Sequence, residues 1–192
     1  MRFYYTNSPT YDTPQTEAKL SLGGFLSSSL IQNDLINNLF SSISELSRQS
    51  LRREAILIAL KNTYTEVIQD VTLEFKVDDF DALVSEFSIA FIVSKTDSCG
   101  NVYFDRIDNS QALPFVDLEV ISDLNKSFSL GDFAVDQVIG IWLIRNIIKA
   151  NVAPLTNAEL EDNYNDDITP ATQENFSLEL SWTSDESGSD SV

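Results

Sequence analysis

The chain has 192 residues, 43% of them hydrophobic and 10% aromatic, which is enough to bury one sizeable core. Its 30 acidic and 12 basic residues give a formal charge of −18, so we expect no nucleic-acid partner, because phosphates would repel such a chain. Histidine is absent, which excludes Ser-His-Asp and Cys-His catalysis and histidine-ligated metal sites within this chain. These properties predict a protein that is not an enzyme.

The beginning of the chain shows no apolar run of the kind that a signal peptide contains. The longest apolar stretch, residues 138–148, is shorter than the roughly 20 residues needed to cross a bilayer. Cys99 is the single cysteine of the sequence, so no internal disulfide bond can form. We therefore expect a protein that is made in the cytoplasm and has no membrane partner.

Residues 1–25 are polar, and Ser21-Leu22-Gly23-Gly24 is a turn signal. We predict that they form an extended arm that either stays disordered or orders on a partner. Apolar residues then recur at spacings near three and four, which predicts a short amphipathic helix. They are Leu30, Ile31, Leu35, Leu39, Phe40 and Ile43. Residues 1–50 are thus expected to form an N-terminal arm with a short helix.

Beyond residue 50 the pattern changes to short apolar or alternating stretches, which predict seven to eight strands. They are expected at 54–60, 71–77, 87–93, 102–104, 116–121, around 128, at 138–148 and at 176–182. Gly100 lies where a hairpin turn requires positive φ, so 102–104 should return antiparallel to the strand before it. The sequence predicts a mainly β fold, an antiparallel β-sandwich of immunoglobulin-like or jelly-roll type over residues 51–183.

The stretch 138–148 is rich in β-branched residues and predicts a deeply buried strand. By alternation we expect Trp142 to face the core and Arg145 to lie on the opposite face. Arg145 then needs an acidic partner, on its own chain or across a subunit contact. Trp142 and Trp182 are both expected in the core; an exposed pair would instead form a platform for carbohydrate.

Beyond Lys149 the sequence contains no basic residue. Residues 184–192 form an acidic tail, which predicts either a solvated segment or a segment that attracts a basic partner surface. Oxygen-bearing side chains at 163, 165, 167 and 174 have the spacing of a calcium loop, but Ile168 stands where that loop needs glycine. We therefore predict a polar loop, with no metal and no cofactor.

Several short motifs occur in a fixed order along residues 20–150. They are Ser21-Leu22-Gly23-Gly24, Asn38-Leu39-Phe40, Leu60-Lys61-Asn62-Thr63, Leu130-Gly131-Asp132 and Ile141-Trp142-Leu143-Ile144-Arg145. In order and spacing this series resembles a group of virion structural proteins from tailed bacteriophages.

The resemblance implies a structural subunit of the tail, baseplate or neck, with no catalytic residues. Its expected partners are other phage structural proteins and further copies of itself, and its expected location is the virion. The alternative within the same class is a capsid decoration or carbohydrate-adhesion module. The motifs mark the candidate interaction residues, which are Leu22, Gly23, Gly24, Leu39, Phe40 and Arg145.

Overall fold

The computed structural model describes residues 1–7, 13–32, 39–40, 43, 52–77, 83, 85–148 and 176–183. Within these ranges the chain is mainly β, with eleven strands and a single 3-10 turn. In chain order the elements are β1 (Arg2–Asn7), η1 (Ala18–Leu20), β2 (Gly24–Leu30), β3 (Arg53–Lys61), β4 (Ile68–Lys76), β5 (Ser85–Val93), β6 (Lys95–Thr96), β7 (Val102–Phe104), β8 (Glu119–Val120), β9 (Ser127–Phe133), β10 (Val138–Ile147) and β11 (Ser177–Thr183). No helix in these ranges is long and apolar enough to span a bilayer.

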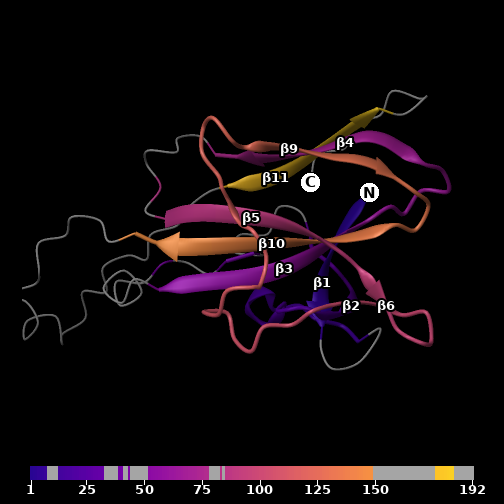
Figure 1. Cartoon of the computed structure of the whole chain (residues 1–192), viewed down its shortest axis with the longest axis horizontal. Coiled ribbons are helices and arrows are strands. Elements are labelled where there is room, and N and C mark those ends of the chain that lie inside the picture. The colour runs from indigo at the N-terminus through magenta and orange to yellow at the C-terminus, as the bar shows by residue number, and fades with distance from the viewer. Residues whose placement is uncertain are drawn as a thin grey trace, which may run out of the picture.

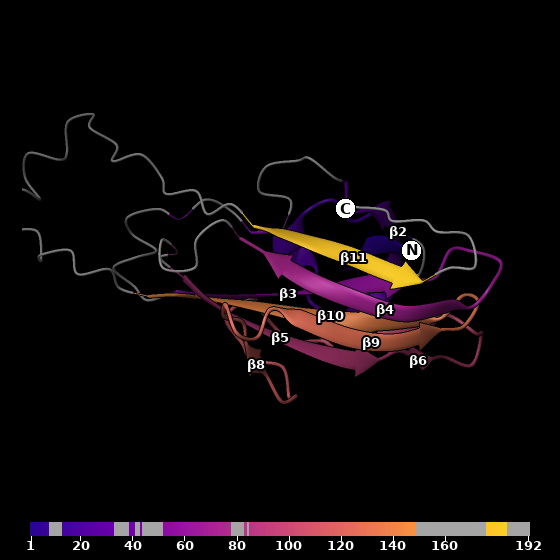
Figure 2. The same cartoon turned by 90° about the horizontal axis from the view of Figure 1, so that it is seen from above.

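The strands form two antiparallel sheets arranged as a sandwich. Eight strands pair in the order β6-β7-β2-β1-β3-β10-β5-β8, and three pair in the order β11-β4-β9. Figure 1 shows the smaller sheet above β5, β10 and β3, with β1 running steeply across the lower part as the larger sheet curls. Figure 2 shows the same layers from above, where β11 and β4 lie side by side. The predicted class, a mainly β sandwich of antiparallel sheets, is confirmed.

Two apolar cores flank the larger sheet. The core between the sheets takes Ile141 and Leu143 from β10 and Leu73 and Phe75 from β4. The second core, on the outer face, is built around Trp142. It is covered by the end of β7, by the chain that follows β7 and by the turn before β2, through Phe104, Ile107, Val116, Leu118 and Leu22.

Two covered faces explain why β3 and β10 read as nearly continuous apolar runs rather than as alternating ones. In both strands almost every residue is buried. Alternation along β10 holds as predicted, since Trp142 and Arg145 lie on opposite faces. The face that carries Arg145, however, is the one that looks toward the second sheet, and Trp142 occupies the outer core. Both sides of this strand are therefore interior.

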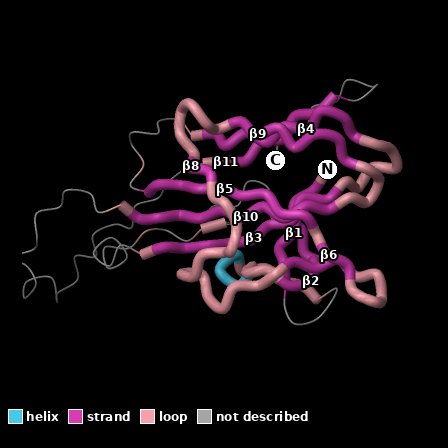
Figure 3. Tube along the Cα trace, in the orientation of Figure 1, coloured by secondary structure: helices cyan, strands magenta, loops and turns pink. Residues whose placement is uncertain are grey.

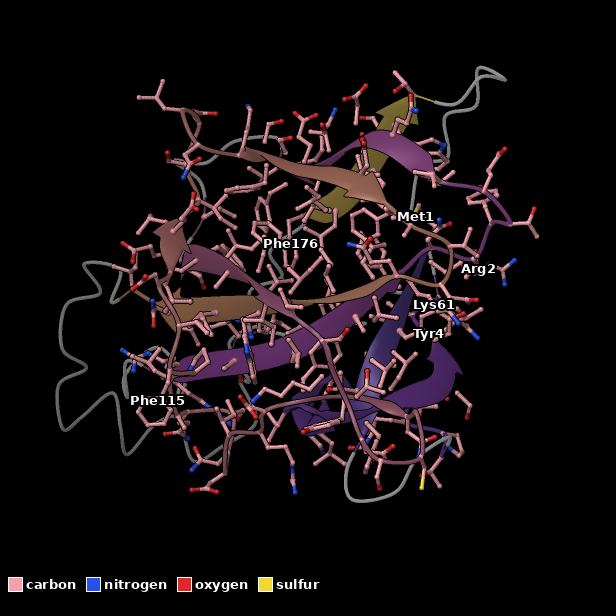
Figure 4. The ribbon with its side chains drawn as sticks, turned by 45° about the vertical axis from the view of Figure 1, so that its right-hand side comes forward. Met1, Arg2, Tyr4, Lys61, Phe115 and Phe176 are labelled. Carbon is pink, nitrogen blue, oxygen red and sulfur yellow. The ribbon has the colours of Figure 1, made fainter. Side chains whose placement is uncertain are left out.

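The predicted N-terminal arm is wrong for the residues that the structure describes. β1 lies inside the larger sheet and pairs with both β2 and β3. Phe3 and Tyr5 are buried, and Arg2 lies opposite Lys61 at the end of β3, as Figure 4 shows. The polar composition suggested an arm because the buried residues of β1 are few. They are covered only when β1 pairs with β3, a strand about 50 residues further along the chain. Deleting residues 1–25 would remove a central strand.

The predicted helix over residues 30–43 lies largely outside the described residues. Leu30 ends β2, Leu39 and Phe40 are buried in the core between the sheets, and Ile43 is also buried. The helical turn that the structure does describe, η1, lies earlier in the chain, beside β3 (Figure 3). The acidic tail at 184–192 and the calcium-like spacing at 163–174 also lie outside the described residues.

Candidate interaction site

Arg145 and Glu54 form a buried ion pair at the end of the sandwich where β10 ends and β3 begins, which we call the Arg145 end. The two residues lie directly opposite each other in the pairing of these strands. A guanidinium nitrogen of Arg145 donates to the Glu54 carboxylate, and the two side chains are 4% and 12% exposed. Of the two partners left open by the sequence, an acid on its own chain is the one found here.

Phe40 covers this ion pair from the core side. The guanidinium carbon of Arg145 lies 4.9 Å from the centre of the Phe40 ring, within the range of a cation–π contact. The Phe40 ring in turn contacts Phe87 and Phe176, with centroids 6.0 Å and 6.1 Å apart. Figure 4 shows Phe176 directed into the interior between the sheets. Packed aromatic rings thus support the ion pair on its core side.

A cavity of about 260 Å³ lies beside the ion pair, along an edge of β3. β1 pairs only with the last part of β3, residues 58–61, and leaves the first part to other partners. There the backbone N–H of Ala55 donates to the Ser110 carbonyl (2.6 Å) and that of Leu57 to the Ser21 carbonyl (2.7 Å). The cavity is the space that remains between β3, the turn η1 and residues 39–40.

The cavity has an apolar floor and charged walls. Ala18, Leu39, Phe40 and Ile56 contribute the apolar surface. The charged groups that line it are Glu17, Lys19, Arg52 and Glu54. Such a combination suits a partner group that is charged at its tip and has an apolar stem.

The charged residues that line the cavity are two acidic and two basic. Lys19 pairs with Glu17 at 2.9 Å. Arg52 and Arg145 both approach Glu54, but Arg145 lies within hydrogen-bonding distance whereas the Arg52 Nε is 3.6 Å from the nearer carboxylate oxygen. Glu54 thus lies within ion-pairing distance of both arginines, and the Arg52 side chain is 45% exposed.

The structure brings together three of the six candidate interaction residues, Leu39, Phe40 and Arg145. Leu39 and Phe40 line the cavity, and Arg145 lies against Phe40. Sequence reasoning missed Glu54 and Arg52, which complete the site. The signal for Glu54 was present, because it is an acid at the start of an otherwise apolar strand, but locating it opposite Arg145 requires the pairing register.

Leu22, Gly23 and Gly24 lie elsewhere and are buried. Leu22 packs into the outer core. Gly23 and Gly24 adopt φ values of +95° and +90°, and a side chain on Gly23 would overlap the carbonyl oxygen of Asp105. They shape the entry into β2 and do not present side chains to a partner.

A buried polar network fixes this same turn and was not anticipated from the sequence. The backbone N–H of Thr6 donates to the Ser21 hydroxyl (2.8 Å), and that of Gly23 donates to the Thr6 hydroxyl (3.0 Å). Both hydroxyl groups are fully buried, and that of Ser21 also donates to the carbonyl of Leu57 on β3. The Ser21–Gly24 motif therefore ties β1 and β2 to β3.

The two tryptophans do not form a carbohydrate platform. Trp142 is 2% exposed and belongs to the outer core, as expected. Trp182 is half-buried at the core between the sheets, and its ring lies 6.1 Å from that of Tyr64. The large sheet separates the two side chains.

The predicted turn at 97–101 is confirmed, with Gly100 at φ +87°. Residues 102–104 (β7) return antiparallel to the short strand β6 and not to the predicted strand at 87–93, which pairs with β10 and β8. The backbone N–H of Asn101 donates to the Asp97 carboxylate, and this bond, with others from the turn, holds the pKa of Asp97 below its usual value. Cys99 lies exposed in the same turn. These bonds account for the acid as a turn-forming residue.

The part of the chain that the structure describes contains no group of three or more acidic or cysteine side chains placed to hold a metal ion. Comparisons with protein-family models, with curated proteins and with solved structures found no match for this chain. Its function must therefore be argued from the site and from the sequence motifs.

Proposed function

We propose that this chain is a non-enzymatic structural subunit of a tailed-phage virion, located in the tail, baseplate or neck, that assembles in multiple copies. The proposal starts from the ordered motifs that resemble such proteins. Within this proposal the sandwich is a rigid block, and the Arg145 end is a contact surface.

One observation supports this reading above the others: the motifs of the resemblance contact each other in the fold. Phe40, from the Asn38–Phe40 motif, lies on Arg145, from the Ile141–Arg145 motif. Ser21, which opens the first motif, is hydrogen-bonded to β3, the strand that leads into the Leu60-Lys61-Asn62-Thr63 motif. Residues that recur together because they build one scaffold are expected to touch in this way, whereas reacting residues would converge on a solvent-accessible centre.

Asn62, in the third motif, is a second case of a motif residue that holds parts of the scaffold together. The side-chain amide of Asn62 donates to the carbonyls of Glu66, Phe133 and Ala134, at 2.9–3.1 Å. Its oxygen accepts from the backbone N–H of Tyr64 at 2.9 Å. One side chain thus joins the turn after β3 to the turn after β9, which fixes the end of the sandwich opposite Arg145.

The test is the composition of the particle. Mass spectrometry of purified virions from the phage that encodes the chain should detect it in stoichiometric, multiple copies. Antibody labelling in electron microscopy should place it on the tail, baseplate or neck. Labelling of the capsid surface would favour the decoration alternative, and absence of the chain from washed particles would overturn the proposal.

A further inference from the structure

The end of the sandwich opposite Arg145 carries an aromatic side chain that is both exposed and supported from the interior. Tyr64, in the turn after β3, is 37% exposed, and its ring lies 6.1 Å from that of Trp182, near the end of β11. Trp182 is half-buried and packs against the core between the sheets, so it holds the Tyr64 ring on its inner side. Figure 1 shows β10 running from this end, where β3 ends, to the Arg145 end.

Asn62 fixes the turn that carries Tyr64. The Asn62 side-chain oxygen accepts from the backbone N–H of Tyr64, and its amide donates to the carbonyl of Ala134, in the turn after β9. That second turn is closed by the backbone N–H of Gln137, which donates to the same carbonyl at 3.0 Å. The two turns therefore form one hydrogen-bonded unit whose shape is set before a ligand arrives, which lowers the cost of binding.

Two valines extend the apolar surface beside Tyr64. Val67 is 53% exposed and Val135 is 47% exposed. Their neighbours in sequence, Glu66 and Ala134, both accept hydrogen bonds from the same Asn62 nitrogen, so the two valine backbones lie close together. We call Tyr64, Trp182, Val67 and Val135 the Tyr64 platform.

The charges at this end disfavour an anionic ligand. Lys61 is paired with Asp136 at 2.9 Å, and Glu66 is exposed in the turn that carries Tyr64. The whole chain has a formal charge of −18, so phosphates and other anions are repelled from its surface. An uncharged ligand avoids this repulsion.

The platform is also small for a protein partner. It consists of four side chains, two of them only about half exposed, whereas a stable protein interface takes about 20–30 residues from each side. An exposed aromatic ring with a polar acceptor nearby matches the size of one sugar unit. The apolar C–H face of a pyranose packs on such a ring, and its hydroxyl groups donate to acceptors such as the Glu66 carboxylate.

We propose that the Tyr64 platform binds a neutral carbohydrate, with one pyranose ring stacked on Tyr64. The sequence suggested an aromatic platform made of two tryptophans, and the structure instead places Tyr64 beside Trp182. Carbohydrate binding would add an activity to the structural role proposed above and does not depend on that role.

The experiment is a fluorescence titration of the purified full-length chain with maltohexaose, cellohexaose, chitohexaose and mannohexaose. Trp182 is the reporter because its ring lies beside Tyr64, whereas Trp142, 2% exposed in the outer core, should give a constant signal. At least one of these oligosaccharides should change the emission to a saturating value. Added salt should leave the affinity unchanged, because the ligand carries no charge to be screened.

Substitutions at Tyr64 test the stacking contact. Tyr64→Ala should weaken binding about tenfold, the size of one aromatic contact, whereas Tyr64→Phe keeps the ring and should bind as wild type does. Tyr103→Ala is the matched control. The Tyr103 ring lies 5.9 Å from that of Phe25 at a similar tilt, 57° against 53°, but in the pairing of β2 with β7, so its loss should leave binding unchanged.

A second variant and a second measurement locate the site. Val135→Asp leaves the aromatic pair intact but puts a charge on the apolar surface, so it should also weaken binding. Changes in amide chemical shifts on adding the oligosaccharide should be confined to residues 62–67, 134–137 and 182–183.

The inference is overturned if none of the four oligosaccharides binds, if Tyr64→Ala and Val135→Asp bind as wild type does, or if the shift changes centre on another part of the fold. These results are separable from the proposed function. A chain that is present in virions and binds none of these sugars refutes the platform alone. A chain that binds one of them but is absent from virions refutes the structural role alone.

Discussion

At the scale of single residues, the Arg145–Glu54 pair illustrates how a charge is retained inside a buried strand. Removing one partner leaves the other charged and desolvated, so Arg145→Met should lower the free energy of unfolding by about 3–5 kcal/mol. The double variant Arg145→Met/Glu54→Leu removes both charges and should recover most of that loss. Urea denaturation of the single and double variants measures both values.

The exposed pair between Lys76 and Glu179, 3.2 Å apart, provides the comparison. Lys76→Met should cost much less than Arg145→Met, because the ammonium and the carboxylate are both exposed to water. A loss at Arg145 no larger than that at Lys76, or a double variant less stable than Arg145→Met, would contradict the buried-pair argument.

Glycine is required at Gly100 because of its backbone conformation, and at Gly23 because of both its conformation and the lack of space for a side chain. Both have positive φ, at +95° and +87°. A Cβ on Gly100 meets no atom within 4 Å, so Gly100→Ala should cost only the backbone strain, about 1–2 kcal/mol. A Cβ on Gly23 would also come within 2.9 Å of the Arg106 Cα, so Gly23→Ala should cost clearly more. Thermal unfolding of both variants tests this, and equal losses would show that the backbone around residue 106 yields easily.

At the scale of elements, the sequence predicted strands well where a single face is solvated. Val71, Leu73 and Phe75 are buried while the residues between them are more exposed, and this alternation was visible in advance. The apolar run of β3 was also identified, because its length fits a strand and a turn follows it. Such strands carry their own signature and need no knowledge of their neighbours.

The missed elements depend on distant partners. β2 follows a turn rich in Ser and Gly. The polar groups of this turn and of β1 form hydrogen bonds inside the fold, such as the one from the Thr6 N–H to the Ser21 hydroxyl. Nothing local indicates that these hydroxyl groups are buried. The cavity at the Arg145 end is likewise formed by segments from four parts of the chain. The sequence located Phe40 and Arg145 through motifs, but only the pairing register adds Glu54.

At the scale of the whole molecule, the two sheets should behave as one cooperative unit. The core between them draws side chains from both, including Leu73 and Phe75 of β4 and Ile141 and Leu143 of β10. Opening either sheet alone would expose this shared apolar surface, at roughly 25 cal/mol for each Å². Local opening should therefore be confined to elements that contribute little to either core, such as β6 and β8, two-residue strands at the edges of the larger sheet.

Native-state hydrogen exchange measures this directly. The central amides of β10 should exchange only through global unfolding, because that strand is hydrogen-bonded on both sides and buried on both faces. The central amides of β4 should open with the same free energy, within about 1 kcal/mol, whereas those of β6 and β8 should exchange by local fluctuation. If β4 instead opened at a much lower free energy than β10, the smaller sheet would be a separate unit. The molecule could not then act as a single rigid block, because the aromatic contacts that hold Phe40 beneath Arg145 pass through Phe75, on the smaller sheet, and Phe176, just before β11.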